Sequence, residues 1–583
     1  RDVAPSRGLG DVYKRQILVD ILVALAVFYY TCVRFHRYWI ALLEAIQLGA
    51  VLWFEYVSHG TLDYYADIVV DNFTLIMILI AGVIGSLIAV FSLGYMEAFQ
   101  KEHRDVRDRR NFFFFVLFLF LSAMFGLVVS NNLLYMYTFW EITSVCSFLL
   151  IGYTESRVAV NNSFKALWMN LLGGAAFAAA IIIMGLTYHS TALSHLVGLA
   201  LAGMPVTVIL ALLLLCGFTK SAMMPFSGWL LGAMVAPTPT SALLHSSTMV
   251  KAGVFLIIKL CPALGNNHAG TMAMFVGGIT FFFASCAAIS QSDGKKVLAY
   301  STISNLGLIV CCAGIGSYEA AWTAIMIVIF HAVAKSLLFL SVGTAEQQLG
   351  SRDIERFDGL FNAMPHLCLC MVIGISGMFL APFGMLISKW AAMKAFIDAG
   401  HPMLLLLLVF GSATTIFYWA KWLGKILSVM NGQERREQGI TKGEWFTLKT
   451  LSWMTIIVCI LFPLISNYGV LPYLRITYGF TRDVIAQSNL IIMSLMVVLL
   501  VILPSRYGKG QPKRKVGALL AGVNMGDDRN YHGAGDNIIP VELRNWYMEE
   551  WFGERKMKLS GFALCMACIF IQFAIILGGV YRG

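Results

Sequence analysis

Apolar runs of about 20 residues recur along the chain from Ile17 to Val580, and short polar segments separate them. A helix of about 20 residues is long enough to cross the hydrocarbon core of a bilayer. The pattern predicts about fifteen or sixteen membrane-spanning helices. Composition agrees, because 58% of the 583 residues are hydrophobic and only 13% are charged. We therefore predict an all-α polytopic membrane protein, which excludes a soluble enzyme, a nucleic-acid binder and a secreted disulfide scaffold.

The first sixteen residues stand outside this pattern. RDVAPSRGLGDVYKRQ is polar and has neither the apolar middle nor the small-residue cleavage site of a signal peptide. Its string SRGLGDVYKRQ resembles translated sequencing-adapter DNA. We expect residues 1–16 to be a non-native segment and residues 17–110 to form the N-terminal transmembrane helices.

The net charge of +10 is unevenly distributed. Roughly 29 basic residues fall on alternate loops, against about four on the others, and this bias marks the cytoplasmic side of membrane proteins. The basic loops contain Arg34 and Arg37, Lys101–Arg110, Lys295 and Lys296, Arg352 and Arg356, residues 421–449, and residues 505–558. The charge thus predicts topology, with these loops cytoplasmic, and indicates no nucleic-acid partner.

The cysteines offer one suggestive motif. Cys565 and Cys568 form a CxxC, a spacing that can bind metal or do redox chemistry, but no second pair accompanies it. We interpret both as apolar filler of a helix. No GxGxxG, Walker-type loop, haem motif or iron–sulfur spacing is present, so we predict no cofactor or metal site in this chain.

Ionisable residues inside the apolar runs carry the chemistry. Each costs at least about 2.5–3.5 kcal/mol at the bilayer centre and needs a polar partner, water or a function. Glu141 lies in the middle of one run, and Lys220 lies in another, five residues before Pro225, which breaks the helix. Irregular backbone at membrane depth is tolerated where it faces protein or a water-filled cavity. A buried lysine beside a helix break therefore indicates a proton or ion site. The alternative for Glu141 is a structural ion pair, and the alternative for Lys220 is an amine that caps the carbonyls of the broken helix.

Two histidines accompany further lysines. His245 and Lys251 are six residues apart, which places them on opposed helix faces about 9 Å apart along the axis. His331 and Lys335 are four apart and share one face, next to Ser336. Because a neutral imidazole can accept and donate a proton, the second pair indicates a relay. A satisfied core histidine remains the alternative for His245.

A second apolar run has the same arrangement of a proline interruption and a lysine. Pro382 and Gly384 interrupt an apolar run, and Lys389 follows. Lys394 lies nearer the end of the run, where snorkelling explains it. Two Pro-broken helices, each with a buried lysine, predict two five-helix repeats over residues 111–262 and 263–426. An odd number of spans inverts one copy relative to the other, as in ion transporters. Residues 427–583 then form C-terminal helices with the cytoplasmic loop 505–558.

Several segments resemble the antiporter-like subunits shared by respiratory complex I, Mrp cation/proton antiporters and membrane-bound [NiFe] hydrogenases. They are FWEITSVCSFLLIGY, GFTKSAMMPFSGWLLGAMVAPTPTSALLHSSTMVKAGVFLIIK, SDGKKVLAYSTISNLGLIV and FHAVAKSLLFLSVGTAEQQLGSRDIERFDGL, and the likeness covers roughly residues 70–430. The resemblance implies fourteen or more helices, two inverted repeats and a hydrated polar axis in the membrane plane.

The resemblance also implies roles for individual residues. It places Glu141 at the family's fifth-helix glutamate, Lys220 at its seventh-helix lysine and Lys389 at its twelfth-helix lysine. His245 and Lys251 fall in the eighth helix, and His331 and Lys335 in the eleventh. The sequence departs from complex I in having Asn170 and small residues where a sixth-helix acid is found, and it lacks the very long extension of the largest Mrp subunit. The stretch after residue 520 is most similar to the large membrane subunit of Ech-type energy-converting hydrogenases.

These implications define the expected function. We expect a proton-translocating subunit of a redox-driven complex, either an energy-converting hydrogenase or a complex I-like NADH-quinone oxidoreductase, in a prokaryotic plasma membrane. Iron–sulfur clusters and a [NiFe] or quinone site are expected in partner subunits, which would form other membrane parts and a peripheral redox arm. The alternative is a subunit of a Mrp-type Na⁺/H⁺ antiporter without redox coupling. A membrane scaffold with inert charges is the third reading, and it leaves the cost of five buried cations unexplained.

Overall fold

The computed structural model describes residues 7–58, 62, 65–380, 383–428, 436–480, 483–507, 523–525, 530–540 and 544–580. Helices make up nearly all of the regular structure in these ranges. Thirteen are long and apolar enough to cross a membrane, or fourteen if the bent pair Lys442–Ile460 and Phe462–Tyr478 forms one span. Thr207–Lys220 and Gln487–Leu500 are shorter apolar helices, and including them brings the total into line with the number expected. The prediction of an all-α polytopic membrane protein is confirmed.

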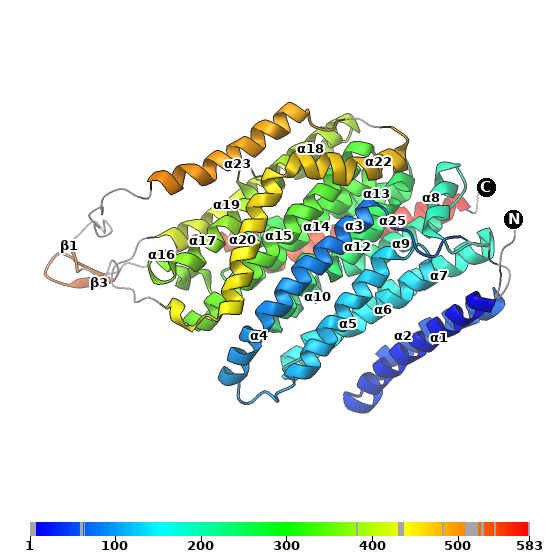
Figure 1. The fold of residues 1–583 in the computed structure, drawn as a ribbon, viewed down its shortest axis with the longest axis horizontal. Coiled ribbons are helices and arrows are strands. Elements are labelled where there is room, and N and C mark those ends of the chain that lie inside the picture. The colour runs from blue at the N-terminus through cyan, green and yellow to red at the C-terminus, as the bar shows by residue number, and fades with distance from the viewer. Residues whose placement is uncertain are drawn as a thin grey trace.

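The N-terminal helices precede the first repeat, and α1 and α2 lie together at one edge of the bundle (Figure 1). They are α1 (Arg7–Phe28), the π-helical turn η1 (Tyr29–Arg34), α2 (Tyr38–Val57), α3 (Asn72–Leu79), the π-helical turn η2 (Ile80–Ile84) and α4 (Gly85–Glu102). Residues 1–6 lie outside the described residues, and the remainder of the segment expected to be non-native forms the start of α1.

The segment predicted as the first repeat contains five spans in the order helix, helix, long helix, broken helix and helix. Its elements are α5 (Arg110–Val129), α6 (Leu133–Ile151), α7 (Arg157–Tyr188), α8 (Leu193–Leu201), α9 (Thr207–Lys220), α10 (Gly228–Gly232), the 3₁₀ turn η3 (Ala233–Val235), α11 (Thr238–Ala242), the π-helical turn η4 (Leu243–Ser247) and α12 (Met249–Leu264).

The segment predicted as the second repeat has the same order of spans. Its elements are α13 (His268–Ile289), α14 (Gly294–Ile315), α15 (Tyr318–Leu349), the 3₁₀ turn η5 (Ile354–Phe357), α16 (Leu360–Ala363), α17 (Pro365–Phe379), α18 (Gly384–Asp398) and α19 (Pro402–Leu427). The third span is 32 residues long in both segments, α7 and α15, and the fourth is interrupted in both. Five spans per segment are the number for which the sequence analysis predicts opposite orientations of the two segments.

The C-terminal part supports the second segment. It comprises the 3₁₀ turn η6 (Glu437–Gly439), α20 (Lys442–Ile460), α21 (Phe462–Leu464), the π-helical turn η7 (Ile465–Val470), α22 (Leu471–Tyr478), α23 (Gln487–Tyr507), strands β1 (Val523–Asn524), β2 (Asn530–His532) and β3 (Ile538–Pro540), α24 (Glu549–Phe552) and α25 (Glu554–Val580). The three short strands pair antiparallel in the order β1-β2-β3. Only parts of the loop predicted over residues 505–558 belong to the described residues.

Polar residues fix where the spans begin. A helix leaves its first N–H groups without intrahelical partners, and an oxygen of the N-cap side chain can accept from one of them. Such caps are made by Asp71, Asn132, Ser156, Asn267, Asp293, Ser317 and Thr441. Between these caps the core contains continuous apolar packing from α3 to α25.

We call the face of the bundle that carries the basic loops the basic side. A cysteine at Arg104, in the α4–α5 loop, should react with a membrane-impermeant maleimide only from the cytoplasm, because the positive-inside rule places the basic side there. A cysteine at exposed Met204, in the α8–α9 loop, is the matched control and should react only from outside. The background carries serine at Cys32 and Cys568, the two cysteines that are not fully buried. The reverse labelling pattern would invert the orientation.

Candidate proton-translocation axis

The buried ionisable residues identified in the sequence lie inside the two repeat segments. Lys220, His245, Lys251, His331 and Lys335 are 0% exposed, whereas Glu141 and Lys389 are 4% and 7% exposed. Their helices are neighbours, since α12 packs against α9 and α14, and α14 packs against α15. Figure 1 shows α12, α14 and α15 crossing the middle of the bundle. A row of polar side chains therefore runs across the interior.

Lys220 is the last residue of α9 and reaches across to α6. Its Nζ donates to the carbonyl oxygen of Trp140 at 2.9 Å and to Ser144 Oγ at 2.7 Å. The ammonium also lies 5.0 Å from the centre of the Trp140 ring, within the range of a cation–π interaction. The backbone leaves the α9 helix after Lys220, and Pro225 lies in the interruption before α10, as the sequence predicted.

Glu141 is next to Trp140 on α6, but the described structure records no ion pair between Glu141 and Lys220. Its Oε1 has no hydrogen-bond partner among the described atoms. That oxygen lies against Gly174 of α7, beside Gln47 Nε2, and the absence of a side chain at Gly174 makes room for both. No contact between Glu141 and Lys220 is therefore part of the described structure, and the Trp140 carbonyl accepts the hydrogen bond from the Lys220 ammonium.

Lys251 and His331 form the central contact of the axis. Lys251 Nζ and His331 Nδ1 are 3.0 Å apart, and they join α12 to α15. The sequence paired His331 with Lys335 on one helix face, whereas the recorded hydrogen bond of His331 crosses to the neighbouring helix. A methyl group at Gly253 would lie 2.6 Å from the Gly217 carbonyl, so α9 and α12 touch through their backbones near this contact.

Lys335 has surroundings of the same kind as Lys220. Its Nζ donates to the Leu298 carbonyl at 3.1 Å and to the hydroxyl of Ser301, both on α14. The amine lies 5.1 Å from the centre of the Trp419 ring. A backbone carbonyl, a serine hydroxyl and a tryptophan ring thus replace water around each of the two lysines.

His245 occupies the π-helical turn η4 just before α12. Its ring lies between Trp229 and Phe339, with centroid distances of 6.4 Å and 5.5 Å. Neither ring nitrogen has a partner among the described atoms. A buried polar group without a partner is commonly satisfied by an internal water molecule, so we expect water at His245.

Lys389 lies on α18, beyond the second interruption. Its Nζ is 5.7 Å from the centre of the Phe281 ring of α13. Gly384 begins α18 and lies so close to the ring of Phe330 that a side chain there would overlap it. Helix α17 ends at Phe379 and α18 begins at Gly384, and Pro382, the predicted cause of the break, lies outside the described residues. Lys394 is partly exposed and pairs with Asp398 at 3.7 Å.

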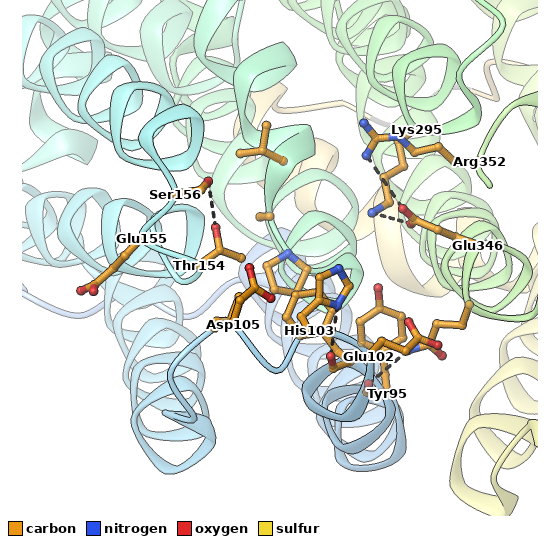
Figure 2. Close-up of a pocket in the computed structure, with 16 residues that line it drawn as sticks. Tyr95, Glu102, His103, Asp105, Thr154, Glu155, Ser156, Lys295, Glu346 and Arg352 are labelled. Atoms are coloured by element: carbon orange, nitrogen blue, oxygen red, sulfur yellow. Dashed lines mark hydrogen bonds and ion pairs between the residues drawn. The ribbon is translucent and has the colours of Figure 1, made fainter. Parts of the chain in front are cut away.

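A cavity of about 530 Å³ opens near the axis on the basic side (Figure 2). The labelled side chains of Lys295, Glu346 and Arg352 converge on one wall of this cavity. Lys295 Nζ lies 2.9 Å from Glu346 Oε2, and Arg352 Nε lies 2.7 Å from Asp293 Oδ2. Acidic and basic groups are mixed in the lining, which is more typical of a water-accessible opening than of a binding site for one ion.

Polar groups connect this cavity with the axis. Tyr95, which lines the cavity, donates to Thr238 Oγ1 at 3.1 Å at the start of α11. Hydroxyl groups further along lack partners among the described atoms, and all lie between Thr238 and His245 or on the facing part of α15; they are Thr240, Ser241 and Ser341. Such groups favour buried water. All three hydroxyl groups are fully buried in the region between the cavity and His245.

Three acidic residues near Glu141 were missed by the sequence reasoning. Asp20 on α1 and Glu44 on α2 are 6% and 5% exposed, and Glu55 on α2 is half-buried. The signal that identified the lysines, an ionisable residue in an apolar run, was present at these positions too. Asn170, which replaces the expected acid, is buried and donates to the Ala166 carbonyl at 2.7 Å.

The CxxC lies in a packed helix. Cys565 is buried and lies 3.8 Å from Thr280 Oγ1, and Cys568 is partly buried. Among the residues that the structure describes, no three His, Cys, Asp or Glu side chains are grouped closely enough to hold a metal ion.

Outside the spans, Glu355 of η5 holds the segment that leads to α25. Its carboxylate pairs with Lys425 at 2.8 Å and accepts hydrogen bonds from Tyr547 and from the Asn545 backbone. Burial raises the pKa of Glu355, but the hydrogen bonds from Lys425 and Tyr547 outweigh burial and leave this pKa below its ordinary value. The carboxylate therefore stays charged and keeps the segment attached.

An interrupted-helix pair with buried lysines on a shared axis defines an antiporter-like membrane subunit. The sequence model described as NADH:quinone oxidoreductase/Mrp antiporter, TM, matches residues 130–415. A second, described as NADH-Ubiquinone oxidoreductase (complex I), chain 5 N-terminus, matches residues 53–113. The chain belongs to this NADH:quinone oxidoreductase/Mrp antiporter family.

Related proteins are found among bacterial antiporters. Na(+)/H(+) antiporter subunit A1 of Staphylococcus haemolyticus (strain JCSC1435) is 33% identical over 386 residues, which are 62% of this chain and 47% of that protein. The subunit A1 of Staphylococcus aureus (strain Newman) is 32% identical over 432 residues, which are 70% of this chain and 52% of that protein. The chain spans about half the length of the curated relatives it matches.

Two solved structures share the fold. The Mrp complex from Dietzia sp. DQ12-45-1b matches with a TM-score of 0.64 at 24% identity, over 85% of this chain and 56% of that chain. The membrane-bound sulfane sulfur reductase, an archaeal respiratory membrane complex, matches with a TM-score of 0.63 at 20% identity, over 84% of this chain and 99% of that chain. At these identities the two neighbours show that the fold is shared.

Ser144→Ala should slow ion transport at least several-fold, because Lys220 loses one of its two oxygen partners, and a hydrogen bond to a charged group contributes about 1.5–3 kcal/mol. Ser147→Ala is the matched control one turn further along α6, since the Ser147 hydroxyl donates only to the Ser144 carbonyl in the recorded contacts. Transport is measured in vesicles at equal complex content. Equal rates in the two variants would remove Ser144 from the function of Lys220.

Proposed function

We propose that the chain translocates protons through its buried Glu/Lys/His axis, as a membrane subunit of a redox-driven complex. The contact that carries the proposal is the 3.0 Å bond between Lys251 and His331, because it joins the first repeat segment to the second at a point sealed from solvent. An amine and an imidazole in contact can exchange a proton, since a neutral imidazole accepts and donates.

The order of the groups supports a direction of transfer. In this proposal the charge of Glu141 holds the proton on Lys220. The Lys220 ammonium donates hydrogen bonds to the Trp140 carbonyl and the Ser144 hydroxyl. A movement that separates the two charges releases that proton toward Lys251 and His331. Lys335 and Lys389 continue the route through the second segment. Two unit charges that separate in a poorly solvated interior change their interaction by several kcal/mol, so a small movement is enough.

The driving force would come from partner subunits. In this proposal a peripheral arm carries iron–sulfur clusters and a [NiFe] or quinone site, the complex is an energy-converting hydrogenase or resembles complex I, and it lies in a prokaryotic plasma membrane with the basic side in the cytoplasm. The subunit itself contributes proton transfer and no redox step.

A second candidate is a Mrp-type Na⁺/H⁺ antiporter subunit without redox coupling. It is favoured by the 32–33% identity to staphylococcal Na(+)/H(+) antiporter subunits A1. The two candidates differ in what drives transport. Vesicles holding the purified complex should acidify or alkalinise on addition of an electron donor in the first case, and only on imposing a Na⁺ gradient in the second.

Lys251→Met should reduce proton translocation by at least about 100-fold, the lower end of what a positioned proton-transfer group contributes. Methionine keeps the length of the side chain but cannot carry a proton. Lys394→Met is the control, because that lysine is partly exposed at the far end of α18. Rates are measured with a pH-sensitive dye in proteoliposomes. Rapid translocation by the Lys251 variant would overturn the proposed route.

The coupling of Glu141 with Lys220 is tested by a double-mutant cycle. Glu141→Gln and Lys220→Ala should each abolish most pumping, and the double variant should be little worse than either, since residues that act as a unit are non-additive. Assembly should survive in the double variant, because both charges leave together and no buried ion is stranded. Effects that simply add would show two independent sites.

A further inference from the structure

The two N-terminal helices bring carboxyl groups to the first half of the axis. Helix α1 packs on α2 and α6, and α2 packs on α7. Asp20 and Glu44 point into this packing and are nearly fully buried, while their helices expose apolar side chains such as Leu22 and Ile46 on the other face. Burial of acids in an otherwise lipid-exposed pair of helices is costly and calls for a function.

Amide and hydroxyl side chains surround these acids and extend to Glu141. Asp20 lies against Thr138 of α6 and Gln16 of its own helix, and Gln16 Nε2 lies 3.5 Å from Glu55 Oε1. Gln47 Nε2 donates to the Tyr137 hydroxyl at 2.6 Å, one turn from Glu141 on α6. Gln47 and Glu141 share the space over Gly174. The polar side chains thus form two groups, one from Glu55 to Thr138 and one from Gln47 to Glu141, which meet at the neighbouring residues Tyr137 and Thr138 of α6.

No lysine or arginine pairs with Asp20, Glu44 or Glu55 in the part of the chain that the structure describes. A carboxyl buried without a cation is stable only with its proton in place. Oxygens of the cluster are also left without partners among the described atoms; they are Gln16 Oε1, Asp20 Oδ2, Glu44 Oε2, Gln47 Oε1, Glu55 Oε2 and Glu141 Oε1. Gln47 is 2% exposed, and its amide oxygen is one of these atoms. Acceptors without a hydrogen-bond partner are therefore not confined to the acids. Such a cluster has places for water molecules to link the acids.

The acids are spread across the membrane. With a rise of 1.5 Å per residue, Glu44 lies about 9 Å from the basic-side end of α2, and Glu55 lies about 26 Å from it. By the same measure, Asp20 lies about 21 Å from the basic-side end of its helix at Arg34, and Glu141 lies about 15 Å from the end of α6 at Ile151. The groups occur at successive depths, with Glu141 between Glu44 and the outer pair.

We propose that Asp20 and Glu55 form a proton-conducting branch that connects Glu141 with the membrane face opposite the basic side, and that Glu44 extends the same row of acids toward the basic side. The inference rests on the proposed proton translocation and adds a route through α1 and α2 to the lysine axis. The carboxyls accept and release protons in turn, and Gln16, Gln47 and Thr138 hold them and the intervening water in place. Because the carboxyls lie at successive depths, a proton can pass from one to the next. A bound cation would instead require several oxygens to converge at one depth.

The test uses the assembled complex in proteoliposomes. Asp20→Asn and Glu55→Gln should each slow proton translocation at least about 100-fold, because each removes a proton-transfer group from the branch. Asp20→Glu should retain most of the rate. Glu97→Gln is the matched control, since Glu97 is an exposed carboxyl on α4 that pairs with Lys101. Complex content, measured in the same vesicles, separates loss of assembly from loss of transfer.

A second measurement reports the protons directly. The infrared C=O band of a protonated carboxylic acid should be present in the wild-type complex at neutral pH and should weaken in Glu44→Gln but not in Glu97→Gln. Gly174→Ala should slow translocation as well, by displacing Glu141 and Gln47, whereas Gly49→Ala on α2 adds a methyl group in open space.

The outcomes separate this inference from the proposed function. If the wild-type complex translocates protons and both acid variants match it, the branch is refuted and the lysine axis stands. Variants that lose Na⁺-dependent transport while proton movement persists would identify a cation site and refute the branch too. If the wild-type complex moves no protons under either driving force, the proposed function fails first.

Discussion

An ammonium group inside a lipid-embedded bundle must be given oxygen atoms in place of water, and this requirement determines how the helices are arranged. Lys220 and Lys335 meet it in the same way, each with one carbonyl and one serine hydroxyl of a neighbouring helix and a tryptophan ring on the open side. The helices that supply these oxygens must lie close to the helices that carry the lysines, α6 beside α9 and α14 beside α15. The chemistry of the axis is thus also what fixes its packing.

Much of this arrangement could be predicted from the sequence, because a charged residue in an apolar run is conspicuous and a proline five residues after a lysine locates the end of a helix. The partners could not. Lys251 bonds His331 across two helices, and nothing in the local sequence of either indicates the other. The π-helical turn at His245 contains neither proline nor glycine, so the assumption of a regular helix from His245 to Lys251 had no visible exception.

The acids of α1 and α2 were missed for a different reason. Their helices precede the region of family resemblance, so no family motif indicates a role for these acids. Yet Asp20 and Glu44 break apolar runs just as Glu141 does. Whether such a residue faces lipid or the bundle depends on which neighbour its helix packs against, and that information lies in the tertiary structure.

The last helix bears on how the subunit can move. Helix α25 packs along α13 of the second segment and also contacts α9 of the first. Gly561 of α25 is so close to Met224 in the first interruption that a side chain there would overlap it, and Tyr300 of α14 donates to Glu554 at the start of α25 at 2.8 Å. Transporters with inverted repeats usually move by rocking one repeat against the other. Such a motion would have to break these contacts of α25. If the subunit translocates protons as proposed, these contacts favour a change of access through side chains and water over rocking of the two segments.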